Sequence, residues 1–214
     1  NTMARNLADD AATIATEIQR VVVTSSQTVQ LAILGLLAEG HILLEDVPGV
    51  GKTLLGKTLA GSIDCDFKRI QFTPDLMPSD IVGTEILEEE EGTGRRRMKF
   101  VKGPIFGNII LGDEINRTPP KTQAALLQAM QEFQVTIAGQ TFDLTRPFLV
   151  LGTQNPIEQE GTYPLPETQL DRFMFRILVD YPTFEKELKI AETTTAEDKP
   201  NLNSLLDGSE IMQL

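Results

Sequence analysis

The chain has 214 residues with a formal net charge of −12, and hydrophobic residues make up 41% of it. Length and composition indicate a globular domain that buries its own apolar core without a disulfide or metal staple. One cysteine, Cys65, and one histidine, His41, exclude a disulfide framework and a zinc cluster of ordinary spacing. No apolar run approaches the roughly 18 residues of a membrane span, and the excess of acids disfavours nucleic-acid binding. We therefore expect a cytoplasmic protein.

Two helices are expected in the first 40 residues, because apolar residues recur at helical spacing on both sides of a break at 24–26. A short apolar run over 41–44 then predicts a buried strand, followed by a glycine turn over 46–51 and a helix over 52–60. A strand, a glycine turn and a helix in this order open a parallel α/β unit.

Four more strands and one more helix are expected further along the chain. The strands are expected at 67–72, 108–112, 148–152 and 175–179. The helix is expected over 121–133, where Leu126, Met130 and Phe133 form one stripe. We therefore predict an α/β fold with a parallel five-stranded sheet flanked by helices.

Two stretches interrupt this alternation and predict hairpin insertions, at 86–101 and at 134–144. In the first hairpin, four glutamates at 88–91 precede three arginines at 95–97. These charges either pair across the strands or lie in water, or they contact a partner protein. From residue 191 onward the sequence loses its apolar periodicity, which is typical of a linker running into a small helical remnant.

The glycine turn carries the strongest chemical signal. Gly51, Lys52 and Thr53 match the last three positions of the phosphate-loop pattern G-x-x-x-x-G-K-[ST], with Asp46 in place of the first glycine. Backbone N–H groups at a helix N-terminus bind phosphate, Lys52 adds positive charge, and the Thr53 hydroxyl can hold Mg²⁺. The residues expected to bind ATP are Asp46, Pro48, Gly49, Val50, Gly51, Lys52, Thr53 and Leu54. An ordinary glycine turn before a helix is the plainer alternative.

Two carboxylates, Asp113 and Glu114, follow the apolar run that begins at residue 109. The carboxyl end of a buried parallel strand is where open α/β sheets bind their ligands. We expect Asp113 to bind Mg²⁺ through water, and Glu114 to orient and deprotonate an attacking water molecule. The alternative is a solvated acidic strand end. The phosphate loop about 60 residues upstream disfavours this alternative.

Two weaker motifs follow. Asn155 comes at the end of the fourth predicted strand, where an amide can contact the γ-phosphate or the attacking water, although Asn-Pro is also a common turn. Arg172 stands between Leu170 and Phe173, and is equally consistent with a surface helix that ends in a salt bridge.

The motifs together resemble MoxR-type AAA+ ATPases, which belong to the helix-2-insert branch of the AAA+ superfamily. Residues 41–53 closely resemble the phosphate loop of that family, including the aspartate in the first-glycine position. Residues 113–123 resemble its Walker B segment and the helix after it, and 153–173 resemble its sensor-1 and arginine-finger region. The resemblance runs from about residue 21 to residue 190.

The resemblance assigns roles to individual residues. It implies Lys52 and Thr53 as the Walker A pair, Asp113 and Glu114 as the Walker B pair, Asn155 as sensor 1, and Arg172 as a finger acting on a neighbour's ATP. Arg117 is a rival candidate for the finger. The resemblance also implies an ATPase core over 1–184, followed over 185–214 by a linker and the start of a truncated helical lid.

The function that this resemblance implies is a Mg²⁺-dependent ATPase that acts as a chaperone-like ring, expected to be hexameric. Such a ring would remodel or activate partner proteins, among them a von Willebrand factor A-domain protein. Two alternatives stay open: a DNA-linked motor, which the arginines at 95–97 would serve, and a nucleotide-dependent structural module with little turnover. Salt-dependent DNA binding would identify the first, and a phosphate-release assay would separate the second.

Overall fold

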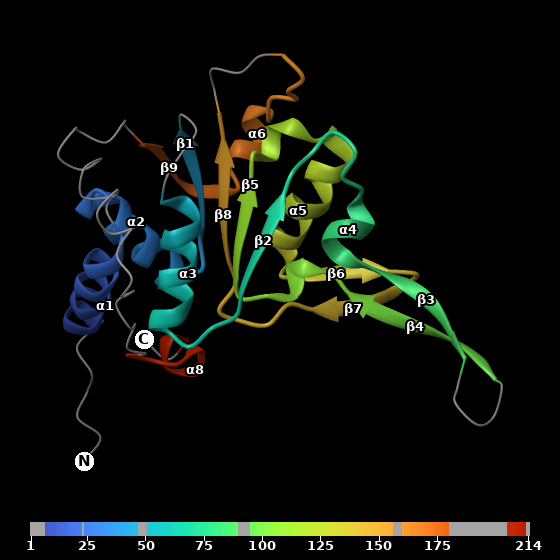
Figure 1. Ribbon diagram of the computed structural model, residues 1–214, viewed down its shortest axis with the longest axis horizontal. Coiled ribbons are helices and arrows are strands. Elements are labelled where there is room, and N and C mark those ends of the chain that lie inside the picture. Colours follow the sequence, from blue (N-terminus) through green and yellow to red (C-terminus); the bar gives the residue numbers. More distant parts are fainter. Residues whose placement is uncertain are drawn as a thin grey trace, which may run out of the picture.

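The computed structural model describes residues 7–22, 24–46, 51–89, 95–155, 160–179 and 205–212. Its centre is a five-stranded sheet in the order β2-β5-β8-β1-β9, and each neighbouring pair is parallel (Figure 1). The strands are β1 (His41–Asp46), β2 (Phe67–Gln71), β5 (Ile109–Asp113), β8 (Leu149–Gln154) and β9 (Phe173–Val179). The predicted parallel five-stranded α/β fold is therefore confirmed.

Helices cover both faces of the sheet (Figure 1). One face packs against α1 (Leu7–Val21), α2 (Ser26–Leu37) and α3 (Lys52–Ser62), and the other against α4 (Pro78–Val82) and α5 (Pro120–Glu132). Successive residues of a strand point to opposite faces, so a strand covered on both faces is apolar throughout. In β1, Ile42 and Leu44 pack into the core on the side of α1, α2 and α3, while Leu43 packs into the core on the side of α4 and α5.

The break predicted at 24–26 separates α1 from α2. Ser25 is the N-cap of α2, and its hydroxyl accepts a hydrogen bond from the Thr28 N–H at 3.1 Å. Such a cap satisfies one of the N–H groups that the first turn of a helix leaves without an intrahelical partner. Among the described residues, none of the helices has the length and apolar character needed to cross a bilayer.

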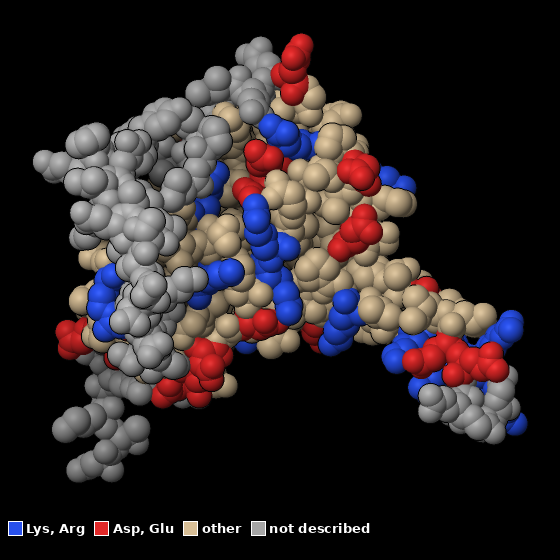
Figure 2. Space-filling model, viewed as in Figure 1, with Lys and Arg blue, Asp and Glu red and all other residues tan. Residues whose placement is uncertain are grey.

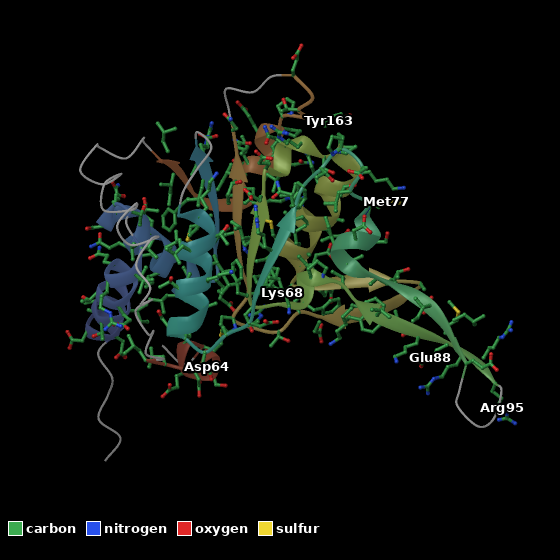
Figure 3. The ribbon with its side chains drawn as sticks, viewed as in Figure 1. Asp64, Lys68, Met77, Glu88, Arg95 and Tyr163 are labelled. Atoms are coloured by element: carbon green, nitrogen blue, oxygen red, sulfur yellow. The ribbon has the colours of Figure 1, made fainter. Side chains whose placement is uncertain are left out.

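Both predicted hairpins are present. The first consists of β3 (Gly83–Glu89) and β4 (Arg96–Lys102) and projects from the body of the molecule, and the second consists of β6 (Gln134–Ile137) and β7 (Gln140–Asp143) (Figure 1). Charged side chains gather toward the far end of the first hairpin (Figures 2 and 3). There Glu88 accepts hydrogen bonds from Lys99 at 2.7 Å and from Arg97 at 3.4 Å. Part of the charge run therefore pairs across the strands.

Short elements escaped the sequence analysis because one turn of helix carries no periodicity. They are α4, two 3-10 helices, η1 (Pro104–Phe106) and η2 (Ile115–Arg117), and the four-residue helix α6 (Glu167–Leu170). The four-residue helix α8 (Gly208–Ile211) lies in the region where a small helical remnant was predicted. Near the C-terminus, Leu206 and Ile211 are each only 4% exposed and pack into the core cluster beneath α1 and α3. Most of the predicted linker lies outside the described residues, and the boundary at residue 184 stays a prediction.

His41 ties the start of β1 to two other elements. Its Nδ1 accepts a hydrogen bond from the Val150 N–H at 3.1 Å, so in the neutral ring Nε2 carries the proton and donates to the Met130 carbonyl at 2.9 Å. The rings of Phe133 and Phe148 lie 5.9 and 5.6 Å from the imidazole. Burial lowers the pKa of His41 from 6.5 to about 4, and the hydrogen bond to Met130 offsets only part of this shift.

We expect this histidine to make the fold acid-sensitive. Between pH 6.5 and about 4 the unfolded chain binds a proton at His41 and the folded chain does not, so its contribution to stability is complete above pH 6.5 and is lost as the pH falls toward 4. The full effect is about 3 kcal/mol. Urea unfolding should therefore show the stability advantage of the native chain over His41→Gln shrinking by about 2 kcal/mol between roughly pH 7.5 and pH 5. An advantage that is equal at both pH values would contradict this role.

Candidate active site

The residues predicted to form the site follow strands that end at one edge of the sheet. Because all five strands are parallel, their carboxyl ends lie on the same edge, at the top of Figure 1. The register places Gly112 of β5 beside Gly152 of β8, and Glu45 of β1 beside Gln154 of β8. The residues that follow β1, β8 and β5 are therefore neighbours, although they are far apart in the sequence.

The turn after β1 leads directly into α3. Gly51 is the N-cap of α3 and has a φ of +108°, a conformation that favours glycine. Within the described ranges no side chain caps this helix, so its N-terminus is oriented to receive an anion. Lys52 and Thr53 form the first turn and are partly buried, whereas Leu54 is 43% exposed. Pro48, Gly49, Val50 and the Asp46 side chain, which were also predicted to bind ATP, lie outside the described residues.

Thr153 positions the Asp113 carboxylate and the backbone of Glu114. This fully buried residue near the end of β8 donates from its hydroxyl to Asp113 Oδ1 at 2.9 Å, and the same oxygen accepts the backbone N–H of Glu114 at 2.8 Å. Glu114 has a φ of 57° and a ψ of 51°, a left-handed conformation that is uncommon for a non-glycine residue. The chain thus turns sharply right after β5, and Thr153 fixes that turn.

Each of the two carboxylates forms an ion pair with an arginine of its own chain. Arg69 on β2 lies 2.6 Å from Asp113 Oδ2, and Arg117 in η2 lies 3.2 Å from Glu114 Oε2. Gln71 connects the two pairs, because it accepts from Arg69 at 2.8 Å and donates to Glu114 Oε2 at 3.3 Å. Arg117, predicted as a rival finger, therefore contacts the carboxylate three residues before it in the same chain.

Asn155 follows β8 and lies against the turn after Glu114. Its carbonyl accepts a hydrogen bond from Asn116 Nδ2 at 3.3 Å, and the Asn116 carbonyl accepts from the Tyr163 N–H at 2.6 Å. From α5, Gln123 is only 2% exposed and donates to the carbonyls of Ile115 at 3.1 Å and Tyr163 at 2.9 Å. Tyr163 lies at the upper edge near α6 (Figure 3). The backbone of the predicted sensor residue therefore contacts Asn116, two residues after Glu114.

A buried carboxylate lies between the predicted phosphate loop and the edge strand. Glu45, 6% exposed, accepts a hydrogen bond from Gln154 Nε2 on β8 and pairs with Arg176 of β9 at 2.7 Å. The pKa of the Arg176 guanidinium is raised by this hydrogen bond to Glu45. Glu45 therefore connects the ends of β8 and β1 to the middle of β9.

Arg172 lies in the turn between α6 and β9. Its neighbours Leu170 and Phe173 both enter the core cluster that includes α5, so the backbone on either side of the arginine is anchored. The Arg172 side chain lines a surface hollow together with Gln131, Thr168 and Asp171. The carboxylates Asp113 and Glu114 pair instead with Arg69 and Arg117.

Sequence reasoning missed four residues of this site. They are Arg69, Gln71, Gln123 and Thr153. Thr153 had a usable signal, since a hydroxyl directly before the tip of a buried apolar strand needs a polar partner. Arg69 and Gln71 on β2 had no such signal in the sequence, because only the strand order β2-β5 places Gln71 opposite Asp113.

Comparison with known proteins connects this site to a family. Residues 41–175 match the family model described as "ATPase family associated with various cellular activities (AAA)". This span contains β1, α3, the two carboxylates, Asn155 and Arg172.

Several relatives match over most of the chain. The chain is 50% identical over 198 residues to chaperone MoxR1 of Mycobacterium tuberculosis, covering 92% of this chain and 51% of that protein. It is 56% identical over 173 residues to the protein YeaC of Bacillus subtilis, covering 81% and 53%. A crystal structure of a Cytophaga hutchinsonii protein matches with a TM-score of 0.85 and 46% identity, covering 96% of this chain and 61% of that one.

The chain thus spans about half the length of the curated relatives it matches. The family model covers more than half of the chain, and the relatives agree with the resemblance inferred from the motifs. The chain belongs to the AAA family of ATPases and is a MoxR-type member of it.

Proposed function

We propose that this chain binds ATP with Mg²⁺ at the carboxyl edge of the sheet and hydrolyses it. The observation that supports this most directly is the pair of contacts from Thr153 to Asp113 and Glu114. They fix the Asp113 carboxylate and the Glu114 backbone at the tip of β5, two strands away from β1 and the N-terminus of α3. An anion-binding helix end beside fixed carboxylates is the donor set that a metal-bound triphosphate requires.

The residues present fit the metal ion as well. Mg²⁺ is usually held in nucleotide sites by one or two protein oxygens together with phosphate oxygens and water. Here the hydroxyl of Thr53 would bind the ion directly, and the carboxylate of Asp113, whose side chain is 15% exposed, would hold it through water. When bound, the ion neutralises the charge that develops on the phosphates.

The other residues of the site would each have a separate role in binding or hydrolysis. Lys52 would bind the β- and γ-phosphates, and Glu114 would accept the proton of the attacking water. Glu114 suits that role because Gln71 and Arg117 both contact Oε2, which restricts its orientation. Asn155 would orient the water or the γ-phosphate, and Arg172 would act on the ATP of a neighbouring subunit.

A finger that acts between subunits implies an oligomer, and we propose a hexameric ring. The relative MoxR1 is named a chaperone, which supports a role in remodelling or activating partner proteins. We propose a von Willebrand factor A-domain protein as one such partner. ATP turnover by this ring, rather than ATP binding alone, distinguishes the proposal from a nucleotide-dependent structural module.

The proposal predicts that Lys52→Ala loses ATP binding. Removing the ammonium group deletes charge-assisted hydrogen bonds to the phosphates, so we expect an affinity weaker by about two orders of magnitude. Calorimetric titration with a non-hydrolysable ATP analogue measures the change. Lys57→Ala is the matched control, because Lys57 is an exposed lysine of the same helix. Binding by Lys52→Ala within threefold of the native chain would contradict the phosphate-loop assignment.

A further inference from the structure

Arg69 reaches the predicted metal-binding carboxylate from a neighbouring strand. β2 lies at one end of the strand order and pairs with β5, with Gln71 directly opposite Asp113. Arg69 precedes Gln71 by two residues, so both side chains leave the same face of β2. From there the Arg69 Nη2 group donates to Asp113 Oδ2 at 2.6 Å and to Gln71 Oε1 at 2.8 Å.

As a result, both oxygens of Asp113 have a hydrogen-bond donor. Thr153 donates to Oδ1 at 2.9 Å and Arg69 donates to Oδ2. The two donors differ in kind, because a hydroxyl can stay in place beside a metal ion whereas a guanidinium carries a positive charge that opposes a second cation. Arg69 also offsets the repulsion between the adjacent carboxylates Asp113 and Glu114, which stabilises the pair before any ligand arrives.

We propose that Arg69 is a built-in counter-cation of Asp113, which competes with the divalent cation for this carboxylate and so lowers the affinity of the nucleotide site for Mg²⁺. This inference rests on the proposed function of the site. The Arg69 side chain can leave its ion pair with Asp113, because it is 47% exposed and can turn into solvent from the edge of the sheet. Mg²⁺ held at Asp113 through water would then weaken this ion pair, which couples arrival of Mg²⁺ to a rearrangement of β2 side chains.

The test measures metal binding without turnover. A fluorescent, non-hydrolysable ATP analogue is titrated into the chain in EDTA and over a series of Mg²⁺ concentrations, and the change in analogue affinity gives the affinity of the complex for Mg²⁺. For Arg69→Gln we expect the Mg²⁺ affinity to rise roughly three- to tenfold, because a half-exposed charged hydrogen bond is removed. Arg69→Lys keeps the charge but loses the planar donor pair, so in this variant the Mg²⁺ affinity should rise by less than in Arg69→Gln.

Lys68→Gln is the matched control. Lys68 is the preceding residue, points to the opposite face of the strand, and pairs with Asp66 at 3.2 Å with 46% exposure, so its loss should leave the Mg²⁺ affinity unchanged. An unchanged or weakened Mg²⁺ affinity in Arg69→Gln, in a variant that still binds the analogue, would overturn the inference alone. A native chain that binds the analogue neither in EDTA nor with Mg²⁺ would overturn the proposed nucleotide site, and this inference with it.

Discussion

Mixing two inactive variants should restore ATP turnover. Arg172→Ala chains keep the predicted Walker residues but lack the finger, whereas Glu114→Gln chains lack the general base but keep Arg172. In a mixed ring, an Arg172→Ala site that receives Arg172 from a Glu114→Gln neighbour becomes complete. An arginine finger delivered between subunits contributes about 10³–10⁵ in turnover in other phosphate-loop enzymes, so the recovered activity should rise far above that of either variant alone.

The location of Arg172 supports this expectation. The turn that carries it is anchored on both sides by Leu170 and Phe173, while its side chain borders a hollow at the surface. A fixed backbone with a side chain at the surface suits a group that reaches a neighbouring molecule, because little further ordering is required when it binds. Arg117, by contrast, pairs with Glu114 of its own chain.

The effect is measured as phosphate release by each variant alone and by mixtures of defined ratio. A size measurement on differently tagged chains shows that the two variants co-assemble. Turnover per chain by the native protein should also rise with protein concentration as rings form. The role in trans would be ruled out by mixed rings that stay inactive, or by a native rate that does not depend on concentration. Arg146→Ala is a suitable control, because Arg146 pairs with Glu39 away from the site.

Glu114→Gln should bind ATP normally and lose hydrolysis. The amide keeps an oxygen for the hydrogen bond from Gln71 and for Arg117. The backbone N–H that donates to Thr153 is unchanged, so the left-handed turn at this position is retained. It cannot accept a proton from water, and loss of a general base costs about 10²–10⁴ in rate. Comparing the affinity for an ATP analogue with the rate of phosphate release separates the two effects.

Glu132→Gln controls for the loss of one negative charge. Glu132 ends α5 and accepts hydrogen bonds from Gln128, on the surface of the helix, so its neutralisation should change neither quantity. If Glu114→Gln lost binding and turnover equally, the carboxylate would have a structural role. If the native chain itself released no phosphate while binding ATP, the structural-module alternative would be favoured.

The sequence was sufficient for most of the secondary structure and for the two strongest motifs. Each predicted strand overlaps an observed one, and for β1, β5 and β8 the reason is that strands buried on both faces leave short continuous apolar runs. The helix expected over 121–133 is observed as α5, and both hairpins occur where the alternation fails. Single-turn elements such as α6 were not predicted, because four residues cannot show a helical period.

Local patterns by themselves determined which residues are candidates for chemistry: a glycine turn before a helix, and two carboxylates after a buried strand. Only the tertiary structure decided what surrounds them. The strand order β2-β5-β8-β1-β9 places Thr153 beside Asp113 and brings Arg69 to the same carboxylate, across separations of 40 and 44 residues. Strand order depends on how helices pack against both faces and not on the composition of any one strand, so the partners of each catalytic candidate cannot be deduced from their spacing.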